Sequence, residues 1–345
     1  MSAASDPAVL DAARDLAARV SGADPGTVRL VRSLSTTWLA TTETVVVKVQ
    51  APGTSREDLA RRLDLAGRPG MDACVVAPLL GKPVLLGGAG PDEVWGTAWP
   101  RVEVLSGGEE ILPWSEAGVL LARLHRIPLP AAAASLPPQG AVTRLKASVE
   151  RLETSVSRLE TSADGGPGGP DVAVPSSLEE AVRVVRDAVA GLPEACWSPF
   201  GGPGRPVAVT HGDWHLGQLG HLGGAGPDRW RLIDVDDLGV GDPAWDLGRP
   251  AAFFAAGLME DAAWAAFLDG YRGAGGPAVP SSGDPWPALD AVAQASLVLA
   301  AASAVRRAVE RAVTDPGAGG LDDLDALLVR VCADLPGTGR AGHPE

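Results

Sequence analysis

His211-Gly-Asp213-Trp-His-Leu-Gly-Gln218 places two histidines, an aspartate and an amide within eight residues. Sixteen residues after Gln218, the apolar pair Leu232-Ile233 ends at Asp234, and two further acids follow at positions 236 and 237. The region closes with Gly241-Asp-Pro-Ala-Trp-Asp-Leu-Gly248. Acids, an amide and histidines gathered beside short apolar runs indicate a site of chemistry, and the rest of the chain is interpreted around it.

The spacing of these polar residues matches the catalytic region of kinases. Protein kinases carry a loop of the form H-R-D-x-x-x-x-N, followed by a metal-binding aspartate. His211, Asp213 and position 218 reproduce the loop, with Gly in place of Arg and Gln in place of Asn. Asp234 stands where the metal ligand follows. The joint spacing therefore predicts a phosphoryl-transfer centre rather than an acidic loop at a strand end.

The same residues, with Gly241-Asp-Pro-x-x-Asp-Leu, resemble the aminoglycoside phosphotransferase and choline kinase superfamily. The string His-Gly-Asp-x-His-Leu-Gly-Gln is most similar to its bacterial maltokinase and glucosamine kinase branch. The resemblance is tight over residues 209–250 and looser over residues 28–124. It implies an α+β, two-lobed protein-kinase-like fold. Residues 1–105 would form a small antiparallel-sheet N-terminal lobe, and residues 106–345 a mainly helical C-terminal lobe with the catalytic loop and acceptor site.

The resemblance also implies roles for residues of the polar stretch. Asp213 would accept the proton of the substrate hydroxyl, or orient it, during attack on the γ-phosphorus. His211 would brace the loop through hydrogen bonds. Gln218 and Asp234 would hold Mg²⁺, with Asp236 as a further ligand directly or through water. Carboxylate and amide oxygens suit this hard cation.

Three further residues are candidates for substrate contact. His215 faces either the substrate or the core, and Trp214 stacks on a sugar face or closes the pocket. Asp237 would suit a cationic amine or a sugar hydroxyl, with surface solvation as the alternative. A zinc site at His211, His215 and His221 is disfavoured, because His-x-x-x-His falls on a glycine-interrupted loop rather than a helix.

The N-terminal region carries the pattern of a small antiparallel sheet. Residues 28–31, 37–40 and 44–49 are rich in β-branched residues and alternate with period two, which predicts strands. Lys48 is the only charge of the third strand and stands where the phosphate-binding lysine belongs. An exposed strand lysine is the alternative. The turn at residues 33–38 contains no glycine, so its serine and threonine hydroxyls and amides would have to meet the phosphates.

Two more segments complete the expected nucleotide site. Residues 54–66 read as a helix with a Thr/Ser cap, and Glu57 in its first turn is expected to pair with Lys48 and aim it at the phosphates. A helix-dipole role is the alternative for Glu57. The strand that begins at residue 94 would lead to a hinge, where the backbone near Trp99, Arg101 and Val102 meets adenine.

Further helices are expected from hydrophobic residues at helical spacing. Residues 164–170, rich in glycine and proline, are expected to form a loop. The apolar stretch at residues 288–304 contains polar residues and is expected to be a buried helix rather than a membrane span. The other expected helices lie at residues 7–22, 114–125, 143–163 and 178–192.

Composition narrows the class of protein. The net charge of −14 argues against a nucleic-acid partner. The three cysteines are far apart, odd in number and lack metal-ligand spacing, as expected for inert thiols in a reducing cytoplasm. The first residues have neither a basic segment nor an apolar one, so no signal peptide is expected. We expect a cytoplasmic enzyme with a small-molecule partner and no membrane partner.

These observations favour an ATP- and Mg²⁺-dependent kinase that phosphorylates an alcohol group of a small molecule. Glucosamine is the first acceptor, because Gln218 and the acids after Ile233 suit an amino sugar. Maltose and aminoglycosides are the alternatives. A nucleotide-binding pseudokinase is the rival from another class, motivated by the glycine-free turn and the Asn-to-Gln exchange. Retention of Lys48, Asp213 and Asp234 argues against it.

Overall fold

The structure is a computed structural model that describes residues 3–33, 37–105, 112–129, 136–163, 176–221, 229–315 and 319–336. The glycine-free turn lies partly outside these residues, at 34–36, and the expected loop at 164–170 lies wholly outside them. The chain folds into two compact units. The first comprises residues 1–139, 208–240 and 266–277, and the second comprises residues 140–207, 241–265 and 278–345.

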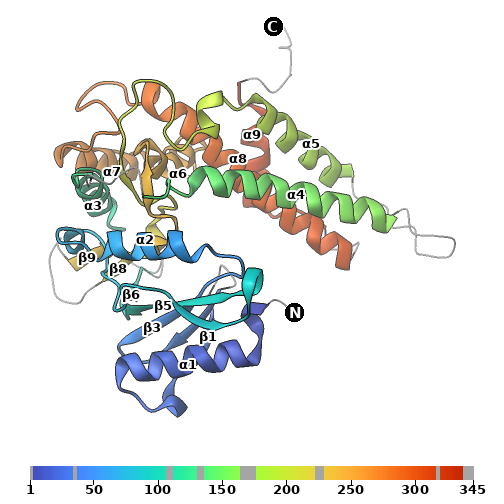
Figure 1. The fold of residues 1–345 in the computed structure, drawn as a ribbon. Coiled ribbons are helices and arrows are strands. Elements are labelled where there is room, and N and C mark those ends of the chain that lie inside the picture. The colour runs from blue at the N-terminus through green and yellow to red at the C-terminus, as the bar shows by residue number, and fades with distance from the viewer. Residues whose placement is uncertain are drawn as a thin grey trace, which may run out of the picture. The chain divides into compact units, whose positions relative to one another are not determined.

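A five-stranded antiparallel sheet lies in the first unit, with the strand order β1-β2-β3-β5-β4 (Figure 1). Its strands are β1 (Arg29–Arg32), β2 (Trp38–Thr41), β3 (Val45–Val49), β4 (Val84–Gly87) and β5 (Val94–Pro100). The three strands expected from the sequence are confirmed to within one residue. Successive side chains point to opposite faces of a strand, so Lys48 lies on the face opposite to its neighbours Val47 and Val49.

Helix α1 (Pro7–Ser21) covers one face of this sheet. The carboxylate of Asp6 accepts a hydrogen bond from the amide of Ala8 and starts the helix, and Gly22 ends it in the left-handed region at φ 72°. The apolar side of α1 packs on alternate strand residues. The core that results includes Val9, Ala13, Leu16, Ala17, Val45, Val47, Val49 and Ala98.

Helix α2 (Arg56–Ala66) lies on the other side of the sheet (Figure 1). Ser55 caps it by accepting a hydrogen bond from the amide of Asp58. Leu59 and Leu63 then pack against Trp95 of β5. Trp95 and Thr97 are two residues apart on β5 and so lie on the same face, and Thr97 is the register partner of Lys48 on β3. Helix α2 therefore packs on the face of the sheet that carries Lys48, and α1 packs on the opposite face.

Short strands carry the polar stretch of the sequence. Strands β6 (Glu103–Val104), β8 (Leu219–His221) and β9 (Trp230–Leu232) form a three-stranded sheet, and β7 (Ala208–Thr210) pairs with β10 (Gly239–Gly241). One-turn 3₁₀ helices follow β7 and β9, at Leu216–Gln218 and Val235–Asp237. Gln218, Asp236 and Asp237 are therefore held in tight turns next to strands.

Helices α3 (Trp114–His125) and α7 (Asp261–Gly273) also belong wholly or in part to the first unit. The ring Nδ1 of His125 lies 2.7 Å from the hydroxyl of Tyr271, and both side chains are buried. His125 therefore has a structural role, as expected for a histidine on an apolar helix.

Helix α8 (Trp286–Thr314) forms the centre of the second unit and packs against α4, α5, α6 and α9 (Figure 1). Among the described residues it is the helix long and apolar enough to cross a bilayer, and 61% of its most apolar window is buried. It is thus the core helix that the sequence predicted. The other helices are α4 (Ala141–Ala163), α5 (Ser176–Gly191), α6 (Ala244–Ala255) and α9 (Asp323–Ala333).

The three cysteines are buried and unbridged. Burial raises the pKa of Cys74 and of Cys332 to about 12 and that of Cys196 to about 11. Because the thiolate is the reactive form, these groups are inert at neutral pH in the folded protein. The expectation of unreactive structural thiols agrees with this geometry.

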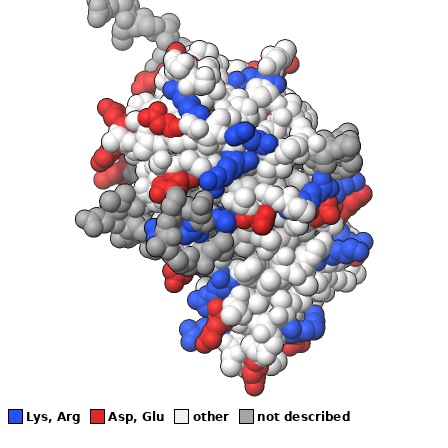
Figure 2. Space-filling view, turned by 90° about the vertical axis from the view of Figure 1, so that its left-hand side faces the viewer, with Lys and Arg blue, Asp and Glu red and all other residues white. Residues whose placement is uncertain are grey.

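Charged side chains of both signs are interspersed on the face drawn in Figure 2. Many of the described acids and arginines form helical pairs one turn apart, such as Arg68 with Asp64 and Arg183 with Asp187. Exposed pairs of this kind stabilise a protein by only ~0.2–1 kcal/mol each.

The α+β class predicted from the sequence is confirmed, since an antiparallel sheet in the N-terminal region precedes a mainly helical region. The lobe boundary at residue 105 stays a prediction.

Gly118 permits a close approach of α3 and α7. A Cβ atom at this position would lie 2.2 Å from the carbonyl oxygen of Phe267 and 2.8 Å from the amide nitrogen of Tyr271. Because both neighbours are backbone atoms, one helix would have to move. Gly118→Ala is expected to lower the free energy of unfolding by about 1–3 kcal/mol, measured by chemical denaturation.

Gly273→Ala is the matched control, because Gly273 ends α7 and a Cβ there meets nothing within 4 Å. It is expected to leave stability unchanged or to raise it by up to about 1 kcal/mol. Equal stabilities for the two variants would contradict the close helix contact.

Candidate functional site

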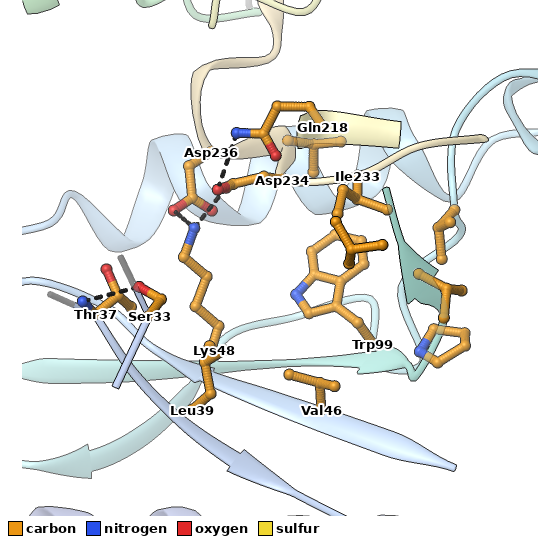
Figure 3. Close-up of a pocket in the computed structure, with 15 residues that line it drawn as sticks. Ser33, Thr37, Leu39, Val46, Lys48, Trp99, Gln218, Ile233, Asp234 and Asp236 are labelled. Carbon is orange, nitrogen blue, oxygen red and sulfur yellow. Dashed lines mark hydrogen bonds and ion pairs between the residues drawn. The ribbon is translucent and has the colours of Figure 1, made fainter. Parts of the chain in front are cut away.

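An ion-pair cluster connects β3 with the turn after β9. The Nζ of Lys48 lies 2.5 Å from Oδ1 of Asp234 and 2.7 Å from Oδ2 of Asp236 (Figure 3). The lysine side chain is 17% exposed, and those of the two aspartates are 34% and 30% exposed. One shielded cation therefore lies between two carboxylates that still face the solvent in part.

The electrostatics keep Lys48 and Asp234 charged. Burial alone would lower the pKa of Lys48, but the nearby carboxylates of Asp236 and Asp234 outweigh burial and hold the pKa above its ordinary value. Burial would raise the pKa of Asp234, whereas the charge and hydrogen bond of Lys48 lower it below its ordinary value. At neutral pH the pair is an ammonium with a carboxylate.

Asp234 has an unusual backbone conformation. Its φ of 60° and ψ of 62° lie in the left-handed region, and it is the one non-glycine residue with positive φ among those described. Aspartate tolerates this region better than most residues. Such conformations persist only where the surroundings impose them, and they cluster at functional sites. The left-handed turn redirects the chain directly after β9.

Hydrogen bonds fix the residue before this turn. The carbonyl oxygen of Ile233 accepts a bond from Nε2 of His211 at 2.7 Å, and its amide donates to the carbonyl oxygen of Gln218 at 2.9 Å. His211 is fully buried, and its Nδ1 accepts a bond from the amide of Asp213. This arrangement places the ring proton on Nε2. His211 thereby braces the catalytic-loop segment against the Asp234 turn.

The remaining loop residues lie on the same segment. Asp213 is half-buried and follows Gly212, whose φ is 83°. His215 accepts a hydrogen bond at Nδ1 from the amide of Gly217 and begins the turn that ends at Gln218. The buried Gln218 donates to Oδ2 of Asp234 at 3.4 Å. The structure thus brings Gln218, Asp234 and Asp236 together with Lys48.

A pocket of about 210 Å³ opens beside this cluster (Figure 3). One end carries Lys48, Asp234, Asp236 and Gln218, and most of the remaining wall is apolar. Other lining residues include Leu39, Val46, Val76, Trp99, Val102, Val104 and Ile233. A charged end and an apolar slot suit a ligand with a polar group at one end and a flat apolar group at the other.

Two of the three residues predicted at the hinge line this pocket, namely Trp99 and Val102. Arg101 does not, because its amide donates to the carbonyl oxygen of Thr44 and its Nη1 to that of Thr42. Asp237 is half-buried at the end of the turn that begins at Val235 and is not among the lining residues.

The structure does not show the expected pair of Glu57 with Lys48. Glu57 accepts a hydrogen bond from Nη2 of Arg61 one turn along α2, at 2.7 Å, and its side chain is 75% exposed. The carboxylates of Asp234 and Asp236 form ion pairs with Lys48 instead. A glutamate in the first turn of a helix is stabilised there by the helix dipole, and this explains its position without a contact to the lysine.

Trp214 is packed inside the protein and does not present its ring to the solvent, where a sugar could stack on it. Its ring stacks on Phe267 with centroids 5.3 Å apart and meets Trp114 edge to face at 6.4 Å. The residue is only 3% exposed. A large aromatic side chain is more stable in this cluster than on a wet surface. The alternative, that Trp214 closes the pocket, stays a prediction, since Trp214 is not among the residues that line the pocket described above.

Two site residues escaped the sequence analysis. Gln50 donates from Nε2 to Oδ1 of Asp236 at 3.3 Å and to Oγ1 of Thr97 at 3.4 Å. Both are buried. The available signal was the strand period, which places Gln50 on the same face of the chain as Lys48.

The donor set fits a magnesium ion. Mg²⁺ prefers oxygen ligands and is usually held by one or two carboxylates together with substrate phosphates. Asp234 and Asp236 supply two carboxylates, and Gln218 contacts Asp234 with an amide that also offers a carbonyl oxygen. No cluster of three or more His, Cys, Asp or Glu side chains suited to a metal occurs within the described ranges.

Removal of the shared cation should destabilise the protein. Lys48→Met would leave two partly buried carboxylates close together, and it is expected to lower the free energy of unfolding by about 1–3 kcal/mol. Lys82→Met is the control, because Lys82 is exposed in a bend before β4. Chemical denaturation of both variants measures the difference, and equal stabilities would contradict the role of Lys48 as a counterion.

Solved structures similar to this chain include three phosphotransferases. The chain is 18% identical to macrolide 2′-phosphotransferase from Brachybacterium faecium, with a TM-score of 0.44 and coverage of 94% of this chain and 99% of that chain. A choline/ethanolamine kinase family protein from Mesorhizobium loti is 16% identical, with a TM-score of 0.45 and coverage of 95% of this chain and 96% of that chain. Ethanolamine kinase from Plasmodium vivax is 10% identical, with a TM-score of 0.46 and coverage of 90% of this chain and 83% of that chain.

No curated protein matches the sequence. The phosphotransferase enzyme family matches residues 27–289. This match covers well over half of the chain, from β1 through the polar stretch to the start of α8. The chain is therefore a member of the phosphotransferase enzyme family.

Proposed function

We propose that this phosphotransferase is an ATP- and Mg²⁺-dependent kinase that phosphorylates a hydroxyl group of a small molecule. The observation that carries the proposal is the convergence of Lys48 with Asp234 and Asp236 at the charged end of an otherwise apolar pocket. A partly buried cation next to acids can meet the opposing needs of nucleotide phosphates and their metal ion.

The apolar slot would take the adenine ring, with Trp99 and Val102 in its wall. Lys48 lies at the other end, where the phosphates would extend toward the ammonium. Asp234, Asp236 and Gln218 would hold Mg²⁺, which neutralises the charge of the phosphates when bound. Lys48, Asp234 and Asp236 lie close enough to act on one ligand.

Asp213 is proposed as the catalytic base. The acceptor oxygen attacks the γ-phosphorus, the bond from that phosphorus to the bridging oxygen breaks, and ADP leaves with the electron pair. The proton of the acceptor hydroxyl passes to the carboxylate of Asp213. Phosphoryl transfer depends mainly on positioning and charge neutralisation, so the hydrogen bonds that fix the loop through His211 contribute to rate by holding Asp213 in place.

A sugar is the proposed acceptor class, with glucosamine first. The proposal follows from the similarity of the 211–218 string to the maltokinase and glucosamine kinase branch and from the additional acid at Asp237. His215 and Asp237 are the proposed acceptor contacts, and Trp214 is removed from that set by its packing. Maltose and an aminoglycoside remain the alternative acceptors within the same chemistry.

A substrate panel tests the proposed activity. ADP release is measured with Mg²⁺ and ATP against glucosamine, glucose, maltose, choline and several aminoglycosides. We expect turnover with glucosamine well above that with the other acceptors. Turnover with another acceptor would support the proposed kinase activity and assign it a different substrate. ATP binding without ADP release on any acceptor would contradict the kinase proposal and favour the pseudokinase.

Replacement of the proposed base tests the mechanism. Asp213→Asn keeps the shape of the side chain and removes its ability to accept the proton, so kcat is expected to fall by at least about 100-fold. Nucleotide affinity, measured by titration calorimetry, should stay within about twofold of the wild-type value.

Asp11→Asn is the control for Asp213→Asn, because Asp11 lies on the exposed side of α1 with its side chain 67% exposed. Its kcat should equal that of the wild type. An unchanged kcat in Asp213→Asn would remove Asp213 from the chemical step.

A further inference from the structure

A chain of polar side chains runs from the apolar slot to Asp236. Nε1 of Trp99 donates to Oγ1 of Thr97 at 2.9 Å, and that oxygen also accepts from Nε2 of Gln50 at 3.4 Å. The same Nε2 donates to Oδ1 of Asp236 at 3.3 Å. Oδ2 of Asp236 contacts Nζ of Lys48. The two oxygens of this carboxylate therefore have different partners.

Burial makes the middle of this chain informative. Thr97 is fully buried and Gln50 is 5% exposed, on a sheet whose other face is covered by an apolar core. Burial of a polar side chain is unfavourable unless its hydrogen bonds are made. An apolar residue at either position would satisfy the packing of a small sheet, so packing alone does not account for an amide and a hydroxyl here.

The backbone places both residues for this contact. Thr97 is the register partner of Lys48 across β3 and β5, and Gln50 lies two residues beyond Lys48. The amide of Gln50 donates to the carbonyl oxygen of Trp95 and continues the pairing of the strands. Lys48, Gln50 and Thr97 therefore project from one rigid surface, toward the turn that carries Asp236.

The two acids of the site are held by different means. Asp234 lies in a left-handed turn that backbone hydrogen bonds fix on either side of Ile233. Asp236 follows two residues later, and its carboxylate contacts Lys48 and Gln50. A bound nucleotide would draw Lys48 toward its phosphates, and Gln50 would then be the neutral donor that keeps Asp236 oriented.

We propose that Gln50, supported by Thr97, positions the carboxylate of Asp236 for binding of a divalent cation with the nucleotide. The inference rests on the proposed function and deepens it. Gln50 is a positioning residue, since it acts through Asp236 and contacts neither metal nor substrate. Partners that orient a metal-binding carboxylate commonly change metal affinity by 10- to 100-fold when removed.

The test measures binding of Mn²⁺ in the presence of ADP by electron paramagnetic resonance. Gln50→Met keeps the length of the side chain and removes the donor, and it is expected to weaken Mn²⁺ binding by about 10- to 100-fold. Thr97→Val should weaken it less, and Thr97→Ser, which keeps the hydroxyl, should bind like the wild type.

Gln294→Met is the matched control for Gln50→Met. Gln294 is also a buried glutamine that donates from Nε2 to an aspartate, Asp290, one turn earlier in α8. The Gln294→Met substitution should leave Mn²⁺ affinity unchanged. Thermal unfolding without ligand separates a change of affinity from a loss of fold, and the Thr97→Val and Thr97→Ser pair decides the matter if Gln50→Met does not fold.

Three outcomes are distinct. Weaker Mn²⁺ binding by Gln50→Met and Thr97→Val, with Thr97→Ser and Gln294→Met unchanged, supports the positioning role. Mn²⁺ affinity within twofold of the wild type in Thr97→Val and in any Gln50 variant that folds overturns it and leaves the proposed function intact. Absence of Mn²⁺-dependent ADP binding by the wild-type protein contradicts the proposed function and overturns this inference with it.

Discussion

The ammonium of Lys48 between Asp234 and Asp236 is the interaction on which the rest of the site depends. It joins residues 186 positions apart in the sequence. Desolvation of a lysine and two acids is costly unless their charges compensate, so neither segment is stable in this position without the other. The five-stranded sheet provides a rigid surface for the lysine, and the turn after β9 provides the acids.

Around this cluster the chain uses backbone geometry as well as charge. Asp234 occupies a left-handed conformation that few side chains tolerate. It is held there by the bond that His211 donates to the carbonyl oxygen of Ile233 and by the bond that the amide of Ile233 donates to Gln218. His211 is therefore important for a physical reason that the 211–218 stretch alone does not show. It connects the loop carrying Asp213 to the turn carrying Asp234, so Asp213 and Asp234 are placed by one set of hydrogen bonds.

Sequence reasoning reached those features that depend on local pattern. Period-two alternation located the strands and placed Lys48 on one of them, and hydrophobic spacing located α3 to the residue. Spacing in the polar stretch identified Asp234 and Asp236, which contact Lys48 in the structure, and Gln218, which contacts Asp234.

The sequence analysis missed contacts that depend on tertiary packing, or expected contacts that the structure does not show. Glu57 carries the right charge in the expected helix, but Arg61 on the same helix is its nearer partner. Trp214 stands beside Asp213 in the sequence, yet an aromatic core formed by residues from α3 and α7 buries it. Gln50 shares a strand face with Lys48, but its contact with Asp236 depends on a turn 186 residues away.

The central claim is that this cluster binds nucleotide phosphates together with a divalent cation. Titration calorimetry with a non-hydrolysable ATP analogue, with and without Mg²⁺, tests it most directly on the wild-type protein and on Asp234→Asn, since asparagine also tolerates the left-handed conformation. Binding that Mg²⁺ strengthens in the wild type but not in the variant is the predicted result. Binding that is equally tight in both proteins, whether or not Mg²⁺ is present, would contradict the claim.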